Sequence, residues 1–446
     1  MPTAAPPTRL RGVEQRRYYA AAVMNNVPRL ALLCAVFALL ACAVTYPLVF
    51  SMDQLLGRIT SPGEEIDVGD GIAFLGYVAR ASRALEAGGS VWAVSIENPN
   101  FTAPPAYLFP AAWLTRGVGN VMVAHNLLLL TYAFAAFACM FGFVYHLTRD
   151  TLASVYSAVL YGGCNYVIHH MSGGHANQSQ IYLFPLIFLC LERLLGVPDW
   201  RRAVLLGGVL GLTAHSSSQY SVFMALLLPL YLVARDPSVL MSNPHRKALA
   251  LAAAVALLGT SYYLAVKLGA GTIERSLWEN QQYVVHSWRE WVDPDAYAHV
   301  GLVPLGLALV ACVGERGAPL GRPTRALAVM LVFCVVMALG PVSAWHPYRW
   351  FYDTVPIFSL MRTPIRFVAP AQMATAALAG IGLARLAAGF AGHQRARRVT
   401  LALVVAASAV STPLLADRYT ARSPEAGRVW VVEVGSHPSF QRVTRQ

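Results

Sequence analysis

An acidic stretch at residues 61–71 interrupts a chain whose formal net charge is +12. Asp70 directly precedes a segment with helical spacing of apolar residues. Its carboxylate could act as a general base at a membrane surface, or help to hold a divalent cation, Mg²⁺ or Mn²⁺, beside a phosphate. A helix N-cap is the structural alternative, and both roles can coexist. Asp67 is the second candidate for catalysis and metal binding, and Glu65 is a candidate for substrate binding, with solvated loop acids as the alternative for both.

Three histidines occur in the segment IHHMSGGHANQSQ, at the edge of a long apolar run: His169, His170 and His175. A zinc site needs three or four ligands with defined geometry, and this segment holds no carboxylate. A histidine here could instead donate a hydrogen bond to a phosphate or an acceptor, and His170 is a substrate-binding candidate. Histidines that simply meet water at a membrane boundary are the alternative.

Arg362 and Arg366 stand four residues apart in the segment MRTPIRF, just before another apolar run. A planar guanidinium group can bind a phosphate through two parallel hydrogen bonds. Both arginines are therefore candidates for binding the phosphate of a donor. Pro364 lies between them and favours the start of a helix at this point. Arginines that extend toward lipid headgroups are the alternative.

Aromatic residues accompany these charges in the segments HSWREWVDPD and RWFYD. Trp288, Trp350 and Tyr352 could stack on sugar rings, or they could belong to the aromatic belt found at membrane interfaces. Polar residues also occur inside apolar runs, where such groups usually face the interior of a bundle and often mark a pathway. Hydrogen bonds between helices are the alternative for this set, which comprises His125, Asn126, Asn165, Gln219 and Gln372.

The elements that must position these residues are membrane-spanning helices. Charged residues make up 13% of the chain, against about 25% in an average soluble protein. Apolar runs of about 18 or more residues recur along the sequence. We predict an all-α polytopic membrane bundle of about eleven spans. They lie near residues 30–50, 119–147, 152–168, 180–196, 203–217, 219–234, 248–266, 300–314, 326–341, 367–387 and 399–416.

Basic residues predict the orientation of this bundle. With eleven spans, the basic residues of the N-terminal tail and the short loops all fall on one side, which the positive-inside rule assigns to the cytoplasm. The N-terminus would then be cytoplasmic, in the plasma (inner) membrane. This distribution explains the basic charge without a nucleic-acid partner. The residues are Arg9, Arg11, Arg16, Arg17, Arg29, Arg149, Arg201, Arg202, Arg235, Arg246, Lys247, Arg316, Arg322, Arg325, Arg395, Arg397 and Arg398.

The opposite, extracytoplasmic side receives the long segments 51–118, 267–299 and 342–366, which hold most of the candidate residues. We therefore expect four regions along the chain. They are a cytoplasmic tail (1–29), a first span with the first outer loop (30–118), a multi-span bundle (119–416) and a short extracytoplasmic tail (417–446).

The segment after Asp70 predicts an amphipathic helix along the membrane surface. Leu75 and Val78 fall on one face at helical spacing, together with Ile72, Ala79, Ser82 and Leu85, whereas Arg80 and Arg83 fall on the other. Such a helix lies in the interface with its apolar face buried and its basic groups toward lipid phosphates.

Several segments together resemble the GT-C class of membrane glycosyltransferases, in an uncharacterised bacterial branch. TYPLVF ends the first span, GDG opens the amphipathic helix, and NPNFTAPPAYLFPAAWLTR follows it. The likeness continues through AHNLLLLTYAF, YVIHHMSGGHANQSQIYLFPLIFLCLERLL and YDTVPIFSLMRTPIRFVAP, and it covers nearly the whole chain at the level of pattern. The short C-terminal tail departs from relatives that carry a larger extracytoplasmic domain.

The resemblance implies transfer of a sugar from a polyprenyl-phosphate donor to a glycan, lipid or protein acceptor outside the cytoplasm. It implies that an acidic residue of the first outer loop, here Asp70, acts as the catalytic base. It also favours His175 over its neighbours as a ligand of the donor phosphate. The sequence has no P-loop motif and no gap between spans large enough for a nucleotide-sugar domain. The donor must therefore arrive from the lipid or from outside. A transporter or flippase of lipid-linked or small polar substrates is the alternative.

Overall fold

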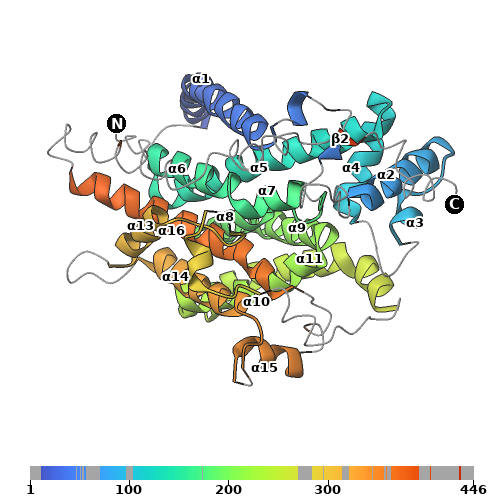
Figure 1. The fold of residues 1–446 in the computed structure, drawn as a ribbon. Coiled ribbons are helices and arrows are strands. Elements are labelled where there is room, and N and C mark those ends of the chain that lie inside the picture. The colour runs from blue at the N-terminus through green and yellow to red at the C-terminus, as the bar shows by residue number, and fades with distance from the viewer. Residues whose placement is uncertain are drawn as a thin grey trace.

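A computed structural model of the chain is helical throughout its described part, apart from one pair of two-residue strands (Figure 1). The residues described are 12–46, 48–50, 52, 55–56, 71–96, 104–172, 174–269, 284–294, 296–313, 321–343, 345–355, 358, 363–390, 402 and 431–432.

Within these residues, three helices are long and apolar enough to cross a membrane: Val121–Thr148, Ser218–Arg235 and Pro364–Gly389. Every predicted span up to residue 387 overlaps a helix, whereas span 399–416 lies outside the described residues apart from Ala402. The helices are α1 (Gly12–Val44), α5 (Val121–Thr148), α6 (Thr151–Gly162), α8 (Leu183–Gly196), α9 (Trp200–Ser216), α10 (Ser218–Arg235), α11 (Asn243–Gly269), α13 (Leu302–Val313), α14 (Arg322–Ala338) and α16 (Val368–Gly389).

Short polar side chains fix where several of these helices begin. The Asn120 side chain accepts hydrogen bonds from the backbone amides of Met122 and Val123 at 2.8 and 3.2 Å, and so caps α5. Asp150 caps α6 and Asp199 caps α9 in the same way, each at 2.9 Å. Because these caps satisfy helix amides that lack a partner within the helix, the turns between neighbouring helices stay short.

Helix α16 forms the centre of the bundle. It packs against α5, α6, α13 and α14. In the most apolar 18-residue stretch of Pro364–Gly389, 94% of the residues are buried. Glycines permit this close packing. A Cβ atom at Gly380 would collide with the Ser157 hydroxyl of α6, and one at Gly382 would collide with the backbone carbonyl of Leu307 in α13. The helix axes therefore approach more closely than larger residues would allow.

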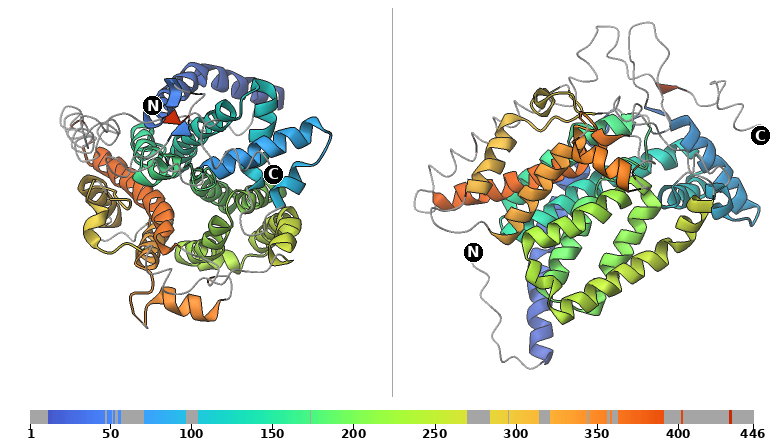
Figure 2. Two further views of the ribbon diagram at one scale, coloured as in Figure 1. Left: turned by 45° about the vertical axis from the view of Figure 1, so that its right-hand side comes forward. Right: turned by 90° about the horizontal axis from the view of Figure 1, so that it is seen from below.

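The outer surface of the bundle exposes large apolar side chains. Leu39 in α1, Leu258 in α11 and Leu309 in α13 are all more than half exposed, and α1 lies at the edge of the bundle (Figure 2, blue). Apolar surface of this extent is stable in contact with lipid chains but costly in water. The surface thus suits helices that are long and apolar enough to cross a membrane.

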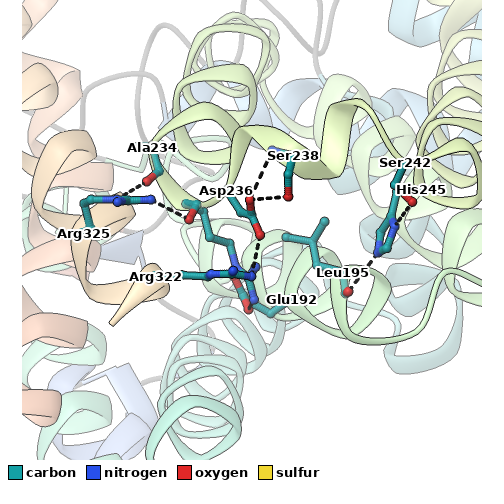
Figure 3. A network of polar contacts seen from close by, with 10 residues as sticks. Glu192, Leu195, Ala234, Asp236, Ser238, Ser242, His245, Arg322 and Arg325 are labelled. Atoms are coloured by element: carbon teal, nitrogen blue, oxygen red, sulfur yellow. Dashed lines mark hydrogen bonds and ion pairs between the residues drawn. The ribbon is translucent and has the colours of Figure 1, made fainter. Parts of the chain in front are cut away.

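Several of the basic segments meet at one end of the bundle. Figure 3 shows Arg322 bridged to Asp236 at 2.5 Å and Arg325 bound to the carbonyl of Ala234. The charges of Arg149 and Arg202 both act on the ring of His146. Loops from α5, α8, α10 and α14, far apart in sequence, therefore share this end, which we call the basic end.

A buried carboxylate holds part of the basic end together. Glu192 in α8 is 4% exposed, and its two oxygens accept hydrogen bonds from Arg235 at 2.5 and 2.8 Å. Tyr231 donates to the same carboxylate at 2.8 Å. A buried charge is tolerated only when it is paired and hydrogen-bonded, so this bidentate contact ties α8 to the end of α10.

The predicted first outer loop contains three helices, which lie at the other end of the bundle: α2 (Gly71–Glu86), α3 (Val91–Ile96) and α4 (Pro105–Val118). The predicted amphipathic helix is α2, whose buried Leu75 and Val78 lie on the face that packs on α4. The same loop contributes strand β1 (Leu55–Leu56), which pairs antiparallel with β2 (Val431–Val432) of the C-terminal tail. Residues 55–56 and 431–432, far apart in the sequence, therefore lie side by side.

The predicted span 152–168 is wrong in one respect, because two helices replace it. Helix α6 ends at Gly162, and α7 (Asn165–Ser172) begins after a break at Gly163 and Cys164. A Cβ atom at Gly162 would lie 2.5 Å from the ring of Phe137, so the chain passes tightly against α5 here. By contrast, the segment HSSSQ is a tight hairpin in which Ser217 alone separates α9 from α10.

Candidate functional site

A cluster of buried aromatic and imidazole side chains occupies the end of the bundle opposite the basic end. Its members come from α7, the turn that follows it, α10 and the segment 296–300. We call it the histidine–tyrosine cluster, and it comprises Tyr166, His170, His175, Tyr220 and Tyr297. Tyr166 and Tyr220 are fully buried and His170 is 3% exposed, so their polar atoms depend on one another for hydrogen bonds.

His170 forms the middle of a three-residue chain. Its Nε2 lies 2.7 Å from the Tyr297 hydroxyl, and its Nδ1 lies 3.1 Å from Nδ1 of His175. A neutral imidazole has one donor and one acceptor. If Tyr297 donates to His170, then His170 donates to His175. In the reverse arrangement His175 donates to His170 and His170 donates to Tyr297, so both imidazoles change tautomer while Tyr297 keeps its proton. The direction of the hydrogen bond at Tyr297 is therefore coupled to which nitrogen of His175 is protonated.

Gln178 supports the tyrosines of this cluster. Tyr166 donates to the Gln178 side-chain oxygen at 3.0 Å, and Tyr220 donates to its backbone carbonyl at 2.6 Å. The Gln178 amide in turn donates to Ser217 at 3.3 Å, in the hairpin between α9 and α10. The tyrosine hydroxyls are thus fixed by α10 and by the turn that precedes α8, which makes the cluster rigid.

Arg366 supplies the positive charge of this site. It lies in the 3₁₀ turn η5 (Pro364–Phe367), and its guanidinium group donates to Gln219, which also donates to Thr363 at 3.2 Å. Its charge acts on His170 and Tyr297. Among the described residues no carboxylate forms an ion pair with Arg366. A half-buried guanidinium group that pairs with no carboxylate in the described part of the chain is suited to an anionic ligand.

Replacing His170 with glutamine makes the protein less sensitive to acid. Burial, and then the charges of Arg366, His175 and His169, lower the pKa of His170 well below its ordinary value of 6.5. Below pH 6.5 the unfolded chain binds a proton at His170 that the folded site does not bind, and this proton favours unfolding. The free energy of unfolding is therefore highest above pH 6.5 and falls as the pH drops below that value. We expect the variant's melting temperature in detergent to fall less steeply between about pH 7 and about pH 5, because one such proton contributes up to about 1.4 kcal/mol per pH unit.

The exposed His286 provides the matched control for this prediction. His286→Gln removes an imidazole that stands outside the cluster, and the acid sensitivity of that variant should equal that of the wild type. An unchanged pH dependence in His170→Gln would show that His170 titrates normally in the folded protein.

The helices of the first outer loop pack against the same end of the bundle. Phe74 of α2 contacts the ring of Tyr107 with centroids 5.5 Å apart, and Tyr107 bonds to His125 of α5 at 2.7 Å. Trp92 of α3 lies 5.5 Å from the ring of His215 at the end of α9. Asp70 directly precedes α2 in the sequence, and α2 thus begins beside the outer ends of the bundle helices.

The predicted site residues fall into three groups. The first group consists of His170 and His175, which contact each other, and Arg366, whose charge acts on His170. Glu65, Asp67, Asp70 and Arg362 lie outside the described residues. The third group consists of the aromatic candidates: Trp288 and Trp350 are 71% and 59% exposed, and no contact joins these two to the histidine–tyrosine cluster among the described residues. Tyr352 lies with Trp350 in α15 (Pro347–Thr354).

Metal binding finds no support in the histidines. The rings of His169 and His175 each lie near that of His170, with centroids 5.3 and 5.0 Å apart. Both nitrogens of His170 already bond to neighbours, and the described residues contain no group of three or more His, Cys, Asp or Glu side chains that could hold a metal ion.

The tyrosines of the cluster were not predicted from the sequence. Tyr166 and Tyr297 stand near the expected membrane boundary, where tyrosine is common for other reasons. A usable signal is that a buried tyrosine hydroxyl needs a partner, so Tyr166, four residues before His170 on one helical face, could have been linked to it. No family model matches the chain, and no curated protein matches it either.

Proposed function

We propose that this chain is a membrane glycosyltransferase that moves a sugar from a polyprenyl-phosphate donor to an extracytoplasmic acceptor. The observation that carries the proposal is Arg366, a guanidinium group without a carboxylate partner in the described residues, beside His170 and His175 at the end opposite the basic loops. Such a group can bind a lipid-linked phosphate at the membrane surface. The resemblance to the GT-C class supports the same assignment.

The proposed reaction exchanges one glycosidic bond for another. The acceptor hydroxyl attacks the anomeric carbon, Asp70 takes up its proton, and the bond from that carbon to the phosphate oxygen breaks. The polyprenyl phosphate leaves with the electron pair. Arg366, with Arg362 and His175, would stabilise the negative charge that develops on the phosphate. The hydrogen bonds from Tyr297 to His170 and from His170 to Nδ1 of His175 would keep Nε2 of His175 protonated. Nε2 could then donate a hydrogen bond to this phosphate.

The orientation proposed for the protein follows the basic loops. They would face the cytoplasm, and the histidine–tyrosine cluster would face the outside, where lipid-linked sugars meet glycan, lipid or protein acceptors. Asp67 and Asp70 carry the oxygen ligands that Mg²⁺ or Mn²⁺ prefers, so a divalent cation at this position belongs to the same proposal.

Replacing Asp70 with asparagine tests the proposal directly. The amide cannot accept the proton of the acceptor hydroxyl, and we expect transfer to fall by about 100-fold or more. The measurement is the incorporation of labelled sugar from a mixture of polyprenyl-phosphate sugars into product by membranes that contain the protein. Glu86→Gln, at the exposed far end of α2, is the matched control and should leave transfer unchanged. Full activity in Asp70→Asn rejects Asp70 as the base.

One observation favours the alternative of a transporter or flippase. The break between α6 and α7, with the buried Asn165 beside it, resembles the interrupted helices that bind substrates in transporters. Movement of a labelled lipid-linked or small polar substrate across proteoliposomes, without a covalent product, would select that function over sugar transfer.

A further inference from the structure

A cavity lies beside the break between α6 and α7. Its walls include Cys164 and Asn165 from the break, His299 from the segment before α13, and Gln372 and Ala376 from α16. The empty space is about 360 Å³, open solvent at its mouth included, and its enclosed part has room for about one water molecule. Neither the proposed reaction nor the helix packing uses this cavity.

Two buried amide groups line the cavity with their orientations fixed. The Gln372 amide nitrogen donates to the backbone carbonyl of His299 at 3.0 Å. The Asn165 amide nitrogen donates to the backbone carbonyls of Pro294 and Ala296 at 3.0 and 2.6 Å. If either amide were flipped, its oxygen would face these carbonyl oxygens, which is unfavourable. In both residues the nitrogen is therefore hydrogen-bonded to the backbone, and the oxygen is the atom that still needs a donor.

These two oxygens lack donors in the described part of the chain. The Gln372 oxygen is buried without a hydrogen-bond partner there. The Asn165 oxygen is not fully enclosed, and in those residues the Asn165 side chain forms hydrogen bonds only through its nitrogen. Gln372 and Asn165 are 3% and 6% exposed. Leaving a buried acceptor unsatisfied is costly, and the cavity is the open space that both residues share.

We propose that this cavity binds one ordered water molecule, which donates one O–H bond to each amide oxygen. A neutral donor fits better than a cation, because none of the described residues that line the cavity is acidic. Two acceptors match the two O–H bonds of water, and a buried water usually forms about three hydrogen bonds. The ring of His299 or the thiol of Cys164 supplies the third contact.

The water site joins the segments that carry the histidine–tyrosine cluster. Asn165 begins α7, which holds Tyr166 and His170, and His299 lies two residues after Tyr297. Gln372 belongs to the buried α16 that follows Arg366. The bound water therefore connects these three segments. It does so beside the break between α6 and α7, where the regular hydrogen bonds of a continuous helix are missing.

A pair of variants of equal shape at Ala376 tests this site. Threonine and valine fill the cavity equally, but threonine brings an O–H donor and valine does not. We expect both to displace the water and the valine variant to melt at least about 3 °C below the threonine variant in detergent, because valine leaves both amide oxygens unsatisfied. The valine variant should also melt below the wild type, because it displaces a water that satisfied the amide oxygens. If the cavity is dry, valine displaces nothing and melts at or above the wild-type temperature, and that result rejects the water site.

Two further measurements keep the test decisive. If either large variant fails to fold, the smaller pair Ala376→Ser and Ala376→Cys makes the same comparison between a strong and a weak donor, with the serine variant expected to be the more stable. Replacing Na⁺ by choline at constant ionic strength should leave the wild-type melting temperature unchanged. A clear shift would identify a cation in the cavity and overturn the assignment of water.

Discussion

Replacing Arg366 with glutamine should lower sugar transfer by about 1,000-fold. The guanidinium group donates to Gln219 but pairs with no carboxylate among the described residues, so its charge is available to a substrate anion. Charge develops on the leaving phosphate as the glycosidic bond breaks, and a fixed cation in a half-buried site stabilises that charge more strongly than water does. The loss should appear in kcat as well as in kcat/KM, because the contact strengthens in the transition state.

Two companion variants sharpen this prediction. Arg366→Lys keeps the charge but loses the planar fork, and we expect an intermediate loss. Arg349→Gln removes an exposed arginine that already pairs with Asp353 at 2.7 Å, and it should leave transfer unchanged. The assay is the release of polyprenyl phosphate by purified protein of normal melting temperature. Equal activity of Arg366→Gln and Arg349→Gln would remove Arg366 from the donor site.

Replacing Gly382 with valine should prevent the bundle from folding. The new Cβ atom would collide with the backbone carbonyl of Leu307 and crowd the amide of Ala311 in α13. These are backbone atoms inside a helix, so they cannot rotate away as a side chain would. Overpacking of this kind costs about 1–3 kcal/mol where side chains can adjust, and more where they cannot. We expect little monodisperse protein in detergent and a strongly reduced melting temperature.

Gly306 offers the matched control, because it lies on α13 one residue before Leu307 and a Cβ atom there meets nothing within 4 Å. Gly306→Val should give a yield and melting temperature close to those of the wild type. If Gly382→Val behaves like Gly306→Val, the close approach of α13 and α16 is not required.

The positions of the helices could be predicted because apolar length is a local property. The run at 119–147 gave α5 nearly to the residue, and alternating basic loops such as those of Arg202 and Arg325 do meet at one end. The break at Gly163 could not be predicted. It depends on the close passage of Gly162 against Phe137, a tertiary contact that hydropathy does not record.

The candidate site could be predicted only in part, for a similar reason. His175 and Arg366 were found because charged or titratable groups at a membrane boundary are unusual. Tyr297 was missed because its role depends on His170, which stands 127 positions away in the sequence. Contacts over such separations arise from how the helices are arranged. A single sequence without its structure carries no direct record of that arrangement.

The burial of α16 has a consequence for the way the protein is made. Synthesis proceeds from the N-terminus, so the ribosome releases α5, α6, α13 and α14 before the helix around which they pack. Until residue 389 has left the ribosome, the partners of Gly380 and Gly382 lack the helix against which they pack. The nascent bundle therefore cannot close before α16 is made, and chains truncated before α16 should be removed by quality-control proteases.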